Sequence, residues 1–218
     1  MKIINTKICI LSVLFISFIF IWWCENKQNN IADETKPIVD DTNKKSETAL
    51  SQQDVSWLVR MREEEKLSRD TYNTLWNKWK NKTFIDVAKV EQLHMNAVKV
   101  LLEKYWIDDP VRDDSVWVFS SFAIKKLYDD SVSQWNKSLL DAFVLAADAE
   151  ALDILDLNDL AEQLHNPDII AVYNTLIVWS RNHLRSYVKN IKNNGGNYKP
   201  KYISQEVYNG IISSQDEK

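Results

Sequence analysis

Four long stretches of the chain repeat apolar residues at the three- and four-residue spacing of one helix face. This periodicity covers residues 54–80, 83–105, 139–157 and 167–190 of the 218-residue sequence, and it predicts four amphipathic helices. No stretch alternates apolar and polar residues as a strand does. Hydrophobic residues make up 45% of the chain, which is enough to bury a sizeable core. We therefore expect an all-α protein whose four helices pack as an antiparallel bundle.

Local signals indicate where the helices begin and how they are joined. Asp54 is a suitable N-cap for the first helix, and Pro167 stands at a first-turn position of the last. Residues 111–138, between the second and third helices, predict a crossover segment with one short helix at 121–131. We expect the third helix to kink into residues 158–164.

The first 53 residues differ in composition from the rest. Lys2 and Lys7 precede an apolar run from Ile8 to Trp23, which is typical of a secretory signal. The run is shorter than the roughly 20 residues of a membrane-spanning helix, and a short uncleaved signal anchor is the alternative. The next residues are polar and predict a flexible tether. The predicted organisation is a signal or anchor, a tether, the bundle and a mostly irregular tail, at residues 1–24, 25–53, 54–191 and 192–218.

Charge and cysteine content exclude several kinds of site. The net charge is -4 and no basic stripe follows a predicted helix, so nucleic acid is not an expected partner. Cys9 and Cys24 both precede the bundle, which therefore has neither a disulfide nor a thiolate metal site. Any metal in the bundle must be held by carboxylates and by His94, His165 or His183. His165 lies in a predicted connection and is expected to be solvated.

Glu91 and His94 interrupt the apolar stripe of the second helix. They are three residues apart, so they share the face that Val87 and Val98 are expected to bury. A buried carboxylate and imidazole are costly unless they are paired or bind a metal. Glu-x-x-His on a core-facing helix is the ligand motif of di-iron and di-manganese carboxylate bundles.

The other three helices carry the same kind of interruption. The first has Glu64 and Glu65 near its inward stripe, and Glu65 fits the spacing better; the third has Glu150 and Asp153, and the fourth has His183. Taken singly, each residue type has another explanation. Glu64 and Glu65 fit a solvated charge run, Asp153 fits a helix cap, and His183 fits a hydrogen-bonded core histidine. Occurring together on four inward stripes, they predict one shared site whose oxygen and imidazole ligands suit iron, manganese or zinc.

Four sequence motifs resemble a ferritin-like family catalogued as a domain of unknown function, DUF 2202. The resemblance extends from about Val55 to Ile211, and the motifs are Met61–Asp70, Glu91–Met95, Ser180–Arg185 and Tyr202–Glu206. It implies a four-helix ferritin-like fold and little about a reaction.

The resemblance also implies a set of metal ligands. These are Glu64 or Glu65, Glu91, His94, Glu150 and His183. The chain departs from the commoner two-motif pattern of di-iron bundles, because Ser180 stands where a carboxylate would precede His183 by three residues. A single-metal or asymmetric site is therefore an alternative to a di-metal centre.

Tryptophan is abundant and glycine is scarce. The sequence has 9 Trp and 3 Gly, and the first 194 residues contain no Gly. In the family that the chain resembles, Gly is common at five of the Trp positions, which are Trp57, Trp106, Trp117, Trp135 and Trp179. Trp106 follows the second helix, where a left-handed cap favours Gly. We interpret these tryptophans as UGA codons that the source organism reads as Gly; a Trp-rich, Gly-poor protein is the alternative.

The same substitution affects the N-terminal segment. Ile-Gly-Gly-Cys would provide the small residues that a lipoprotein cleavage site needs, whereas the printed chain has Trp22 and Trp23 before Cys24. Cys24 would then be the lipidated first residue of an envelope protein held at the membrane outside the cytoplasm.

Two functions remain open at this stage. The first is a bundle that binds iron or manganese and acts as an oxidase, a peroxidase or a metal-handling protein. The second is a metal-free structural or interaction bundle of the envelope, whose polar core residues fix helix register. Neither the substrate nor whether the chain forms a homodimer follows from the sequence.

Overall fold

The computed structural model describes residues 50–135 and 137–217. That part of the chain forms helices and no strand, so the predicted all-α class is confirmed. The predicted signal, Cys24 and most of the predicted tether lie outside the described residues. The helices are α2 (Gln52–Trp79), α3 (Lys82–Lys104), α4 (Phe122–Trp135), α5 (Leu139–Ala161), α6 (Pro167–Asn193) and α7 (Gln205–Ser213).

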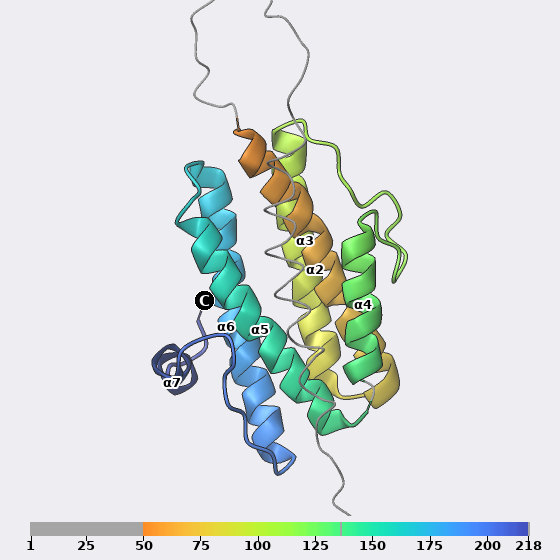
Figure 1. Cartoon of the computed structure of the whole chain (residues 1–218), viewed down its shortest axis with the longest axis vertical. Coiled ribbons are helices and arrows are strands. Elements are labelled where there is room, and N and C mark those ends of the chain that lie inside the picture. The colour runs from red at the N-terminus through yellow and green to blue at the C-terminus, as the bar shows by residue number, and fades with distance from the viewer. Residues whose placement is uncertain (1–49, 136, 218) are drawn as a thin grey trace, which may run out of the picture. The chain divides into compact units, whose positions relative to one another are not determined.

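The long helices form two antiparallel pairs, α2 with α3 and α5 with α6 (Figure 1). The turn between α2 and α3 is short because Lys80 adopts the left-handed conformation, with φ of 51°, and its N–H donates to the carbonyl of Trp76. Helix α4 packs along α2, and the connection before it crosses from the α3 end. The short helix predicted at 121–131 corresponds to α4, which extends to Trp135.

Several boundaries differ from the predicted ones. Ser51, and not Asp54, is the N-cap of α2. Asp54 occupies the third helical position, where its carboxylate accepts from the N–H of Ser51 in a capping box. Helix α5 continues through Asn158 and ends at Ala161. The tail that was predicted to be irregular contains α7, which buries Tyr208 and Ile211.

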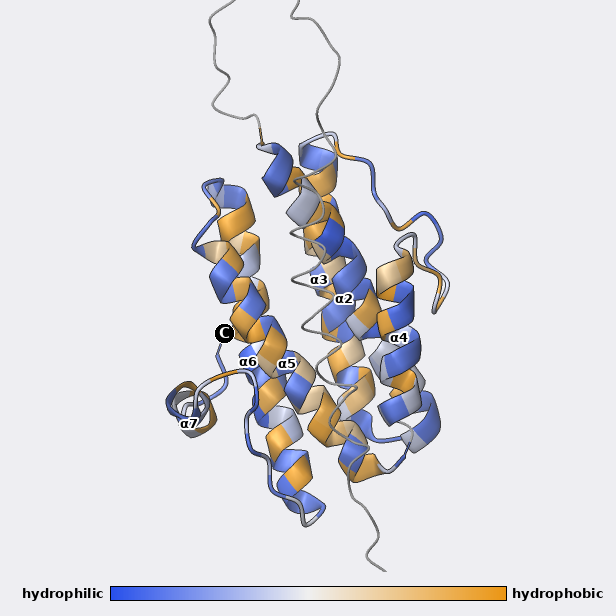
Figure 2. Ribbon diagram, viewed as in Figure 1, coloured by the Kyte–Doolittle hydropathy of each residue, from blue (hydrophilic) through white to orange (hydrophobic). Residues whose placement is uncertain are grey.

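The apolar core is divided into two clusters. One contains Phe84 and Tyr187, the other contains Leu58 and Leu102, and the inward faces of the long helices contribute to both. Hydrophobic and hydrophilic residues alternate along the ribbons of the long helices (Figure 2). Along each long helix, the polar residue that interrupts the stripe falls between residues of the core. A polar site therefore lies within an otherwise apolar interior.

The connection between α3 and α4 contains two tryptophans with left-handed backbone. Trp106 has φ of 55° and Trp117 has φ of 63°, which is a conformation that favours glycine. Trp57 and Trp179 lie inside helices, and Trp135 is the last residue of α4. The left-handed backbone therefore favours glycine at Trp106 and Trp117, which are two of the five tryptophans that the sequence analysis interprets as Gly.

Among the described residues, no helix combines the length and the apolar composition needed to cross a bilayer.

Candidate metal centre

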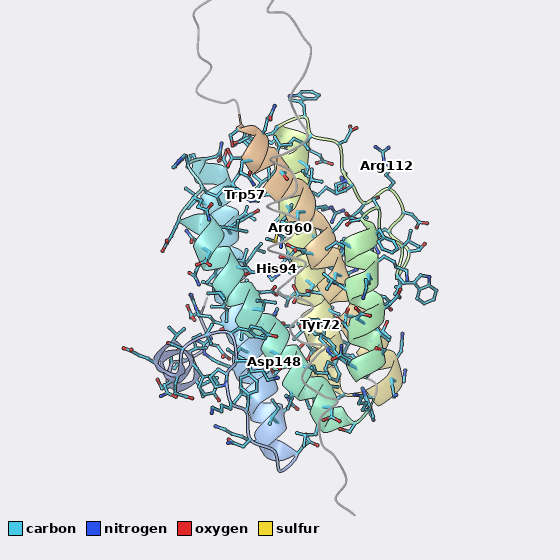
Figure 3. The ribbon with its side chains drawn as sticks, in the orientation of Figure 1. Trp57, Arg60, Tyr72, His94, Arg112 and Asp148 are labelled. Atoms are coloured by element: carbon cyan, nitrogen blue, oxygen red, sulfur yellow. The ribbon has the colours of Figure 1, made fainter. Side chains whose placement is uncertain are left out.

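Each long helix contributes to one buried group of carboxylates and imidazoles. Glu65 comes from α2, Glu91 and His94 from α3, Glu150 from α5 and His183 from α6. All five are less than 9% exposed. Figure 3 shows His94 on the side of α3 that faces the α5–α6 pair. Helical spacing explains the convergence, because each of these residues continues the stripe that its helix buries.

Glu91 joins two sets of ligand atoms. One set is Glu65, Glu91 and His94, the other is Glu91, Glu150 and His183, and within each set the ligand atoms lie within 4.8 Å of one another. The Oε2 atom of Glu91 is 2.9 Å from Nδ1 of His94, and its Oε1 atom is 3.2 Å from Nδ1 of His183. The two oxygens of one carboxylate therefore face two different imidazoles, as in a carboxylate that bridges two cations.

The pKa values of the buried groups reflect two opposing effects, which are the loss of solvation and the charges of neighbouring groups. Burial alone would lower the pKa of His94, but Glu65 and Glu91 raise it to about 11. Burial likewise opposes protonation of His183, yet Glu150 and Glu91 raise its pKa to about 9. Burial raises the pKa of Glu65 to about 7. Burial also disfavours ionised Glu91, but His183 and His94 hold its pKa well below the ordinary value. Without metal, protonated imidazoles are thus the cations that balance the carboxylates.

The donor set fits a divalent cation in each half. Each half has two carboxylates and one imidazole and no sulfur, which suits iron, manganese or zinc. Nδ1 of His183 lies 3.2 Å from Glu91 and 3.4 Å from Glu150, yet no hydrogen bond reaches it from the described residues. A buried nitrogen that faces two carboxylates without bonding either is a suitable ligand for a cation placed among them.

Tyr72 supports the centre from outside the ligand set. Its hydroxyl donates to Oε1 of Glu150 at 2.6 Å, which leaves the other oxygen of Glu150 toward His183. Hydrogen bonds of this kind fix the orientation of ligating carboxylates. The sequence analysis did not single out Tyr72 as part of the site, although a tyrosine seven residues after Glu65 lies on the same helix face.

The remaining candidates lie apart from the two sets. Glu64 accepts a hydrogen bond from Nε of Arg60 at 2.8 Å and is partly exposed. Of the two glutamates that the sequence left open, Glu65 is therefore the one in the group. His165 is exposed, as predicted, and Asp153 is half-buried one turn beyond Glu150. Ser180 is buried but belongs to neither set.

The opposite face of α2 holds the α3–α4 connection. Lys66 and Asp70 form a fully buried ion pair at 2.5 Å, and Asp70 also accepts from the N–H of Trp117 at 3.1 Å. Glu63 accepts from the N–H of Ser120 at 2.6 Å. The charged residues in the middle of α2 thus lie on two faces of the helix. Glu65 faces the centre, and Glu63, Lys66 and Asp70 face the α3–α4 connection. Sequence reasoning missed the second role.

A family described as "Uncharacterized protein domain (DUF2202)" matches residues 54–215. The chain is 48% identical over 169 residues to an uncharacterised protein of Methanocaldococcus jannaschii, MJ0754, covering 78% of this chain and 91% of that protein. The crystal structure of hypothetical protein MJ0754 has a TM-score of 0.76 to this chain at 47% identity, covering 80% of this chain and all of the other.

Proposed function

Because the chain belongs to the uncharacterised DUF2202 family, no known activity comes with its membership, and we propose a function from the buried site. The proposal is a ferritin-like four-helix protein that binds two cations of iron or manganese in the bundle. The observation that carries it is the sharing of Glu91 between two sets of carboxylate and imidazole ligands. This is the arrangement of di-iron and di-manganese carboxylate bundles, with one motif incomplete at Ser180.

The residues have distinct parts in this proposal. Glu91 would bridge the two cations, Glu65 and His94 would complete one half, and Glu150 and His183 the other. Iron or manganese would supply one-electron redox chemistry, which suits an oxidase, a peroxidase or a metal-handling protein. The protein contributes a buried environment and orients Glu150 through Tyr72, and the imidazoles would release their protons when cations bind.

Metal analysis of the full chain tests the proposal. We expect about two iron or manganese ions per chain after anaerobic loading and desalting, as two half-sites require. Glu91→Ala should remove both, because it removes the shared ligand. Glu103→Ala is the matched control, since Glu103 lies on the same helix but is exposed and pairs with Lys99. Optical spectra after addition of oxygen or hydrogen peroxide would then separate catalysis from simple binding.

A metal-free bundle is the competing function. The observation in its favour is that Nδ1 of His94 is already hydrogen-bonded to Glu91 and Glu65 and that His183 lies within ion-pair distance of Glu91, as in a polar network that fixes helix register. Wild-type protein without stoichiometric metal, together with unchanged melting of the Glu91→Ala plus His94→Ala variant, would refute the metal centre.

We also propose that the protein is held at a membrane of the cell envelope through its N-terminal segment. The support is the sequence of the first 24 residues, with Lys2 and Lys7 before the apolar run and Cys24 after it. Metabolic labelling with a fatty acid, compared between wild type and Cys24→Ser, tests lipidation in the source organism. Equal labelling of the two proteins would refute Cys24 as the attachment site.

A further inference from the structure

Helix α3 carries an apolar stripe on its outer side as well as the one that it buries. The residues of this outer stripe follow one another at spacings of three, four and three, and they are Val90, Leu93, Ala97 and Val100. Leu93 is 63% exposed and Val100 is 60% exposed, although α3 packs on both α2 and α6. Alternating spacings of three and four are the repeat with which two helices pack along each other. The outer stripe is therefore suited to one more helix.

Opposite charges stand at the two ends of the outer stripe. Asp86 precedes Val90 by four residues and Lys104 follows Val100 by four, so both continue the same side of α3. The side chain of Asp86 is 46% exposed and that of Lys104 is 53% exposed. Each pairs with an exposed group of its own chain, and each remains accessible to another molecule.

The apolar part of the stripe is complementary to itself when two copies run in opposite directions. With a two-fold axis midway between Leu93 and Ala97, Leu93 of each copy lies opposite Ala97 of the other. Val90 of each copy then lies opposite Val100. A large side chain meets a small one in the central layers, which lets facing side chains interdigitate. A parallel pair would instead place Ala97 against Ala97 and leave a gap beside Leu93.

The charged ends decide between the two directions. In the antiparallel pair, Asp86 of each copy lies opposite Lys104 of the other, so an ion pair closes each end. In a parallel pair, Asp86 would meet Asp86 and Lys104 would meet Lys104, and these like charges repel. Charge complementarity therefore identifies a second copy of this chain, running in the opposite direction, as the molecule that fits the outer stripe.

We propose that the chain forms a two-fold dimer in which the outer stripes of two antiparallel α3 helices pack against each other. The contact runs from Asp86 to Lys104, about 27 Å at 1.5 Å per residue. Each contact occurs twice, because the same surface serves both copies. Glu91 and His94 are buried on the other side of α3, so the dimer goes beyond the proposed metal centre and does not rest on it.

Analytical ultracentrifugation of the full metal-free chain, at a series of concentrations, tests the dimer. A detergent keeps the apolar run from Ile8 to Trp23 dissolved, and that run is the same in every variant. We expect wild type to change from monomer to dimer as its concentration rises. Leu93→Glu should raise the dissociation constant at least about tenfold, because it places two like charges near the centre of the contact. Val207→Glu is the matched control, since Val207 is an exposed apolar residue of α7.

A charge exchange tests the direction of the two helices. Asp86→Lys alone and Lys104→Asp alone should each raise the dissociation constant by about tenfold at low salt, because each places like charges opposite each other at both ends. The double variant, Asp86→Lys plus Lys104→Asp, should associate as wild type does. Its rescue cannot come from within one chain, because the partners Lys82 and Asp168 then face like charges.

Three results would overturn the proposal. The first is wild type that stays monomeric at every concentration. The second is Leu93→Glu that associates as tightly as wild type, or is weakened no more than Val207→Glu. The third is a double charge variant that associates no better than the single ones, because the helices would then not be antiparallel in this register. Far-UV circular dichroism of each variant shows that it is folded, and none of these results bears on metal binding.

Discussion

Replacing Trp106 with glycine should stabilise the protein, although glycine usually destabilises. Trp106 has φ of 55° and is 95% exposed, so its indole contributes almost no buried area. Its N–H donates to the carbonyl of Glu103, and glycine keeps that bond. The substitution therefore removes a strained Cβ and little else.

The size of the gain follows from two opposing terms. A left-handed conformation costs a residue with a Cβ roughly 1–2 kcal/mol, and glycine loses about 0.5–1 kcal/mol through the greater freedom of the unfolded chain. Trp106→Gly should thus add about 0.5–1 kcal/mol to the free energy of unfolding. For a folded unit of this size, that raises Tm by about 1–4 °C.

Urea denaturation followed by far-UV circular dichroism measures this gain, with an unchanged m value. Trp106→Ala is the decisive control, because alanine removes the indole but keeps the Cβ and should bring no gain. Trp57→Gly should instead destabilise by more than about 1 kcal/mol, since Trp57 lies inside α2 and packs on the core. A Trp106→Gly variant no more stable than Trp106→Ala would refute the reasoning.

The residue at position 106 also bears on how the codons of the gene are translated. If Trp106 and Trp117 are encoded by UGA and the source organism reads UGA as Gly, its protein carries the favoured residue at both left-handed positions. UGG codons at these positions would contradict the interpretation. Mass spectrometry of the protein from its native source would decide between the two residues directly.

Four further predictions concern the centre, its support by Tyr72, and the Lys66–Asp70 pair. In metal-free protein, Glu150 and Glu91 raise the pKa of His183 from its ordinary 6.5 to about 9. The stabilising charge of His183 is therefore complete below pH 6.5 and is lost as pH rises through 9. The urea midpoint should fall across that range. Metal binding displaces the same proton, so its calorimetric heat should depend on the ionisation enthalpy of the buffer, and independence of the buffer would contradict protonated imidazoles. Tyr72→Phe should weaken metal affinity by about tenfold in a chelator competition, whereas Tyr128→Phe, which loses only a bond to Thr74, should not. Asp70→Asn should destabilise by about 3–5 kcal/mol in urea because it leaves Lys66 buried without its counter-charge, and a loss below 1 kcal/mol would refute a structural role for that pair.

The apolar stripes made most of the fold predictable. Burial of one helix face determines which residues repeat, and the same rule places Glu65, Glu91 and His183 inside. Spacing favoured Glu65 over Glu64 but left both open, because adjacent residues point only about 100° apart on a helix.

Other features depend on contacts between distant segments. Lys66 and Asp70 are part of a charge-rich stretch, and only the position of the α3–α4 connection reveals that they are buried. Helix α7 escaped prediction because it has only 9 residues, one of them Gly210, and buries only Tyr208 and Ile211. Its stability comes from packing, which a local pattern does not contain.

Glu91 also determines how the two halves of the centre depend on each other. Because its two oxygens face His94 and His183 separately, a cation in one half would fix the carboxylate that the other half also uses. The two binding events are then thermodynamically linked, and the effect of the first on the second equals the effect of the second on the first. If two cations bind, their titration would be described by a coupling free energy between two sites, and among the described residues Glu91 is the side chain common to both sets.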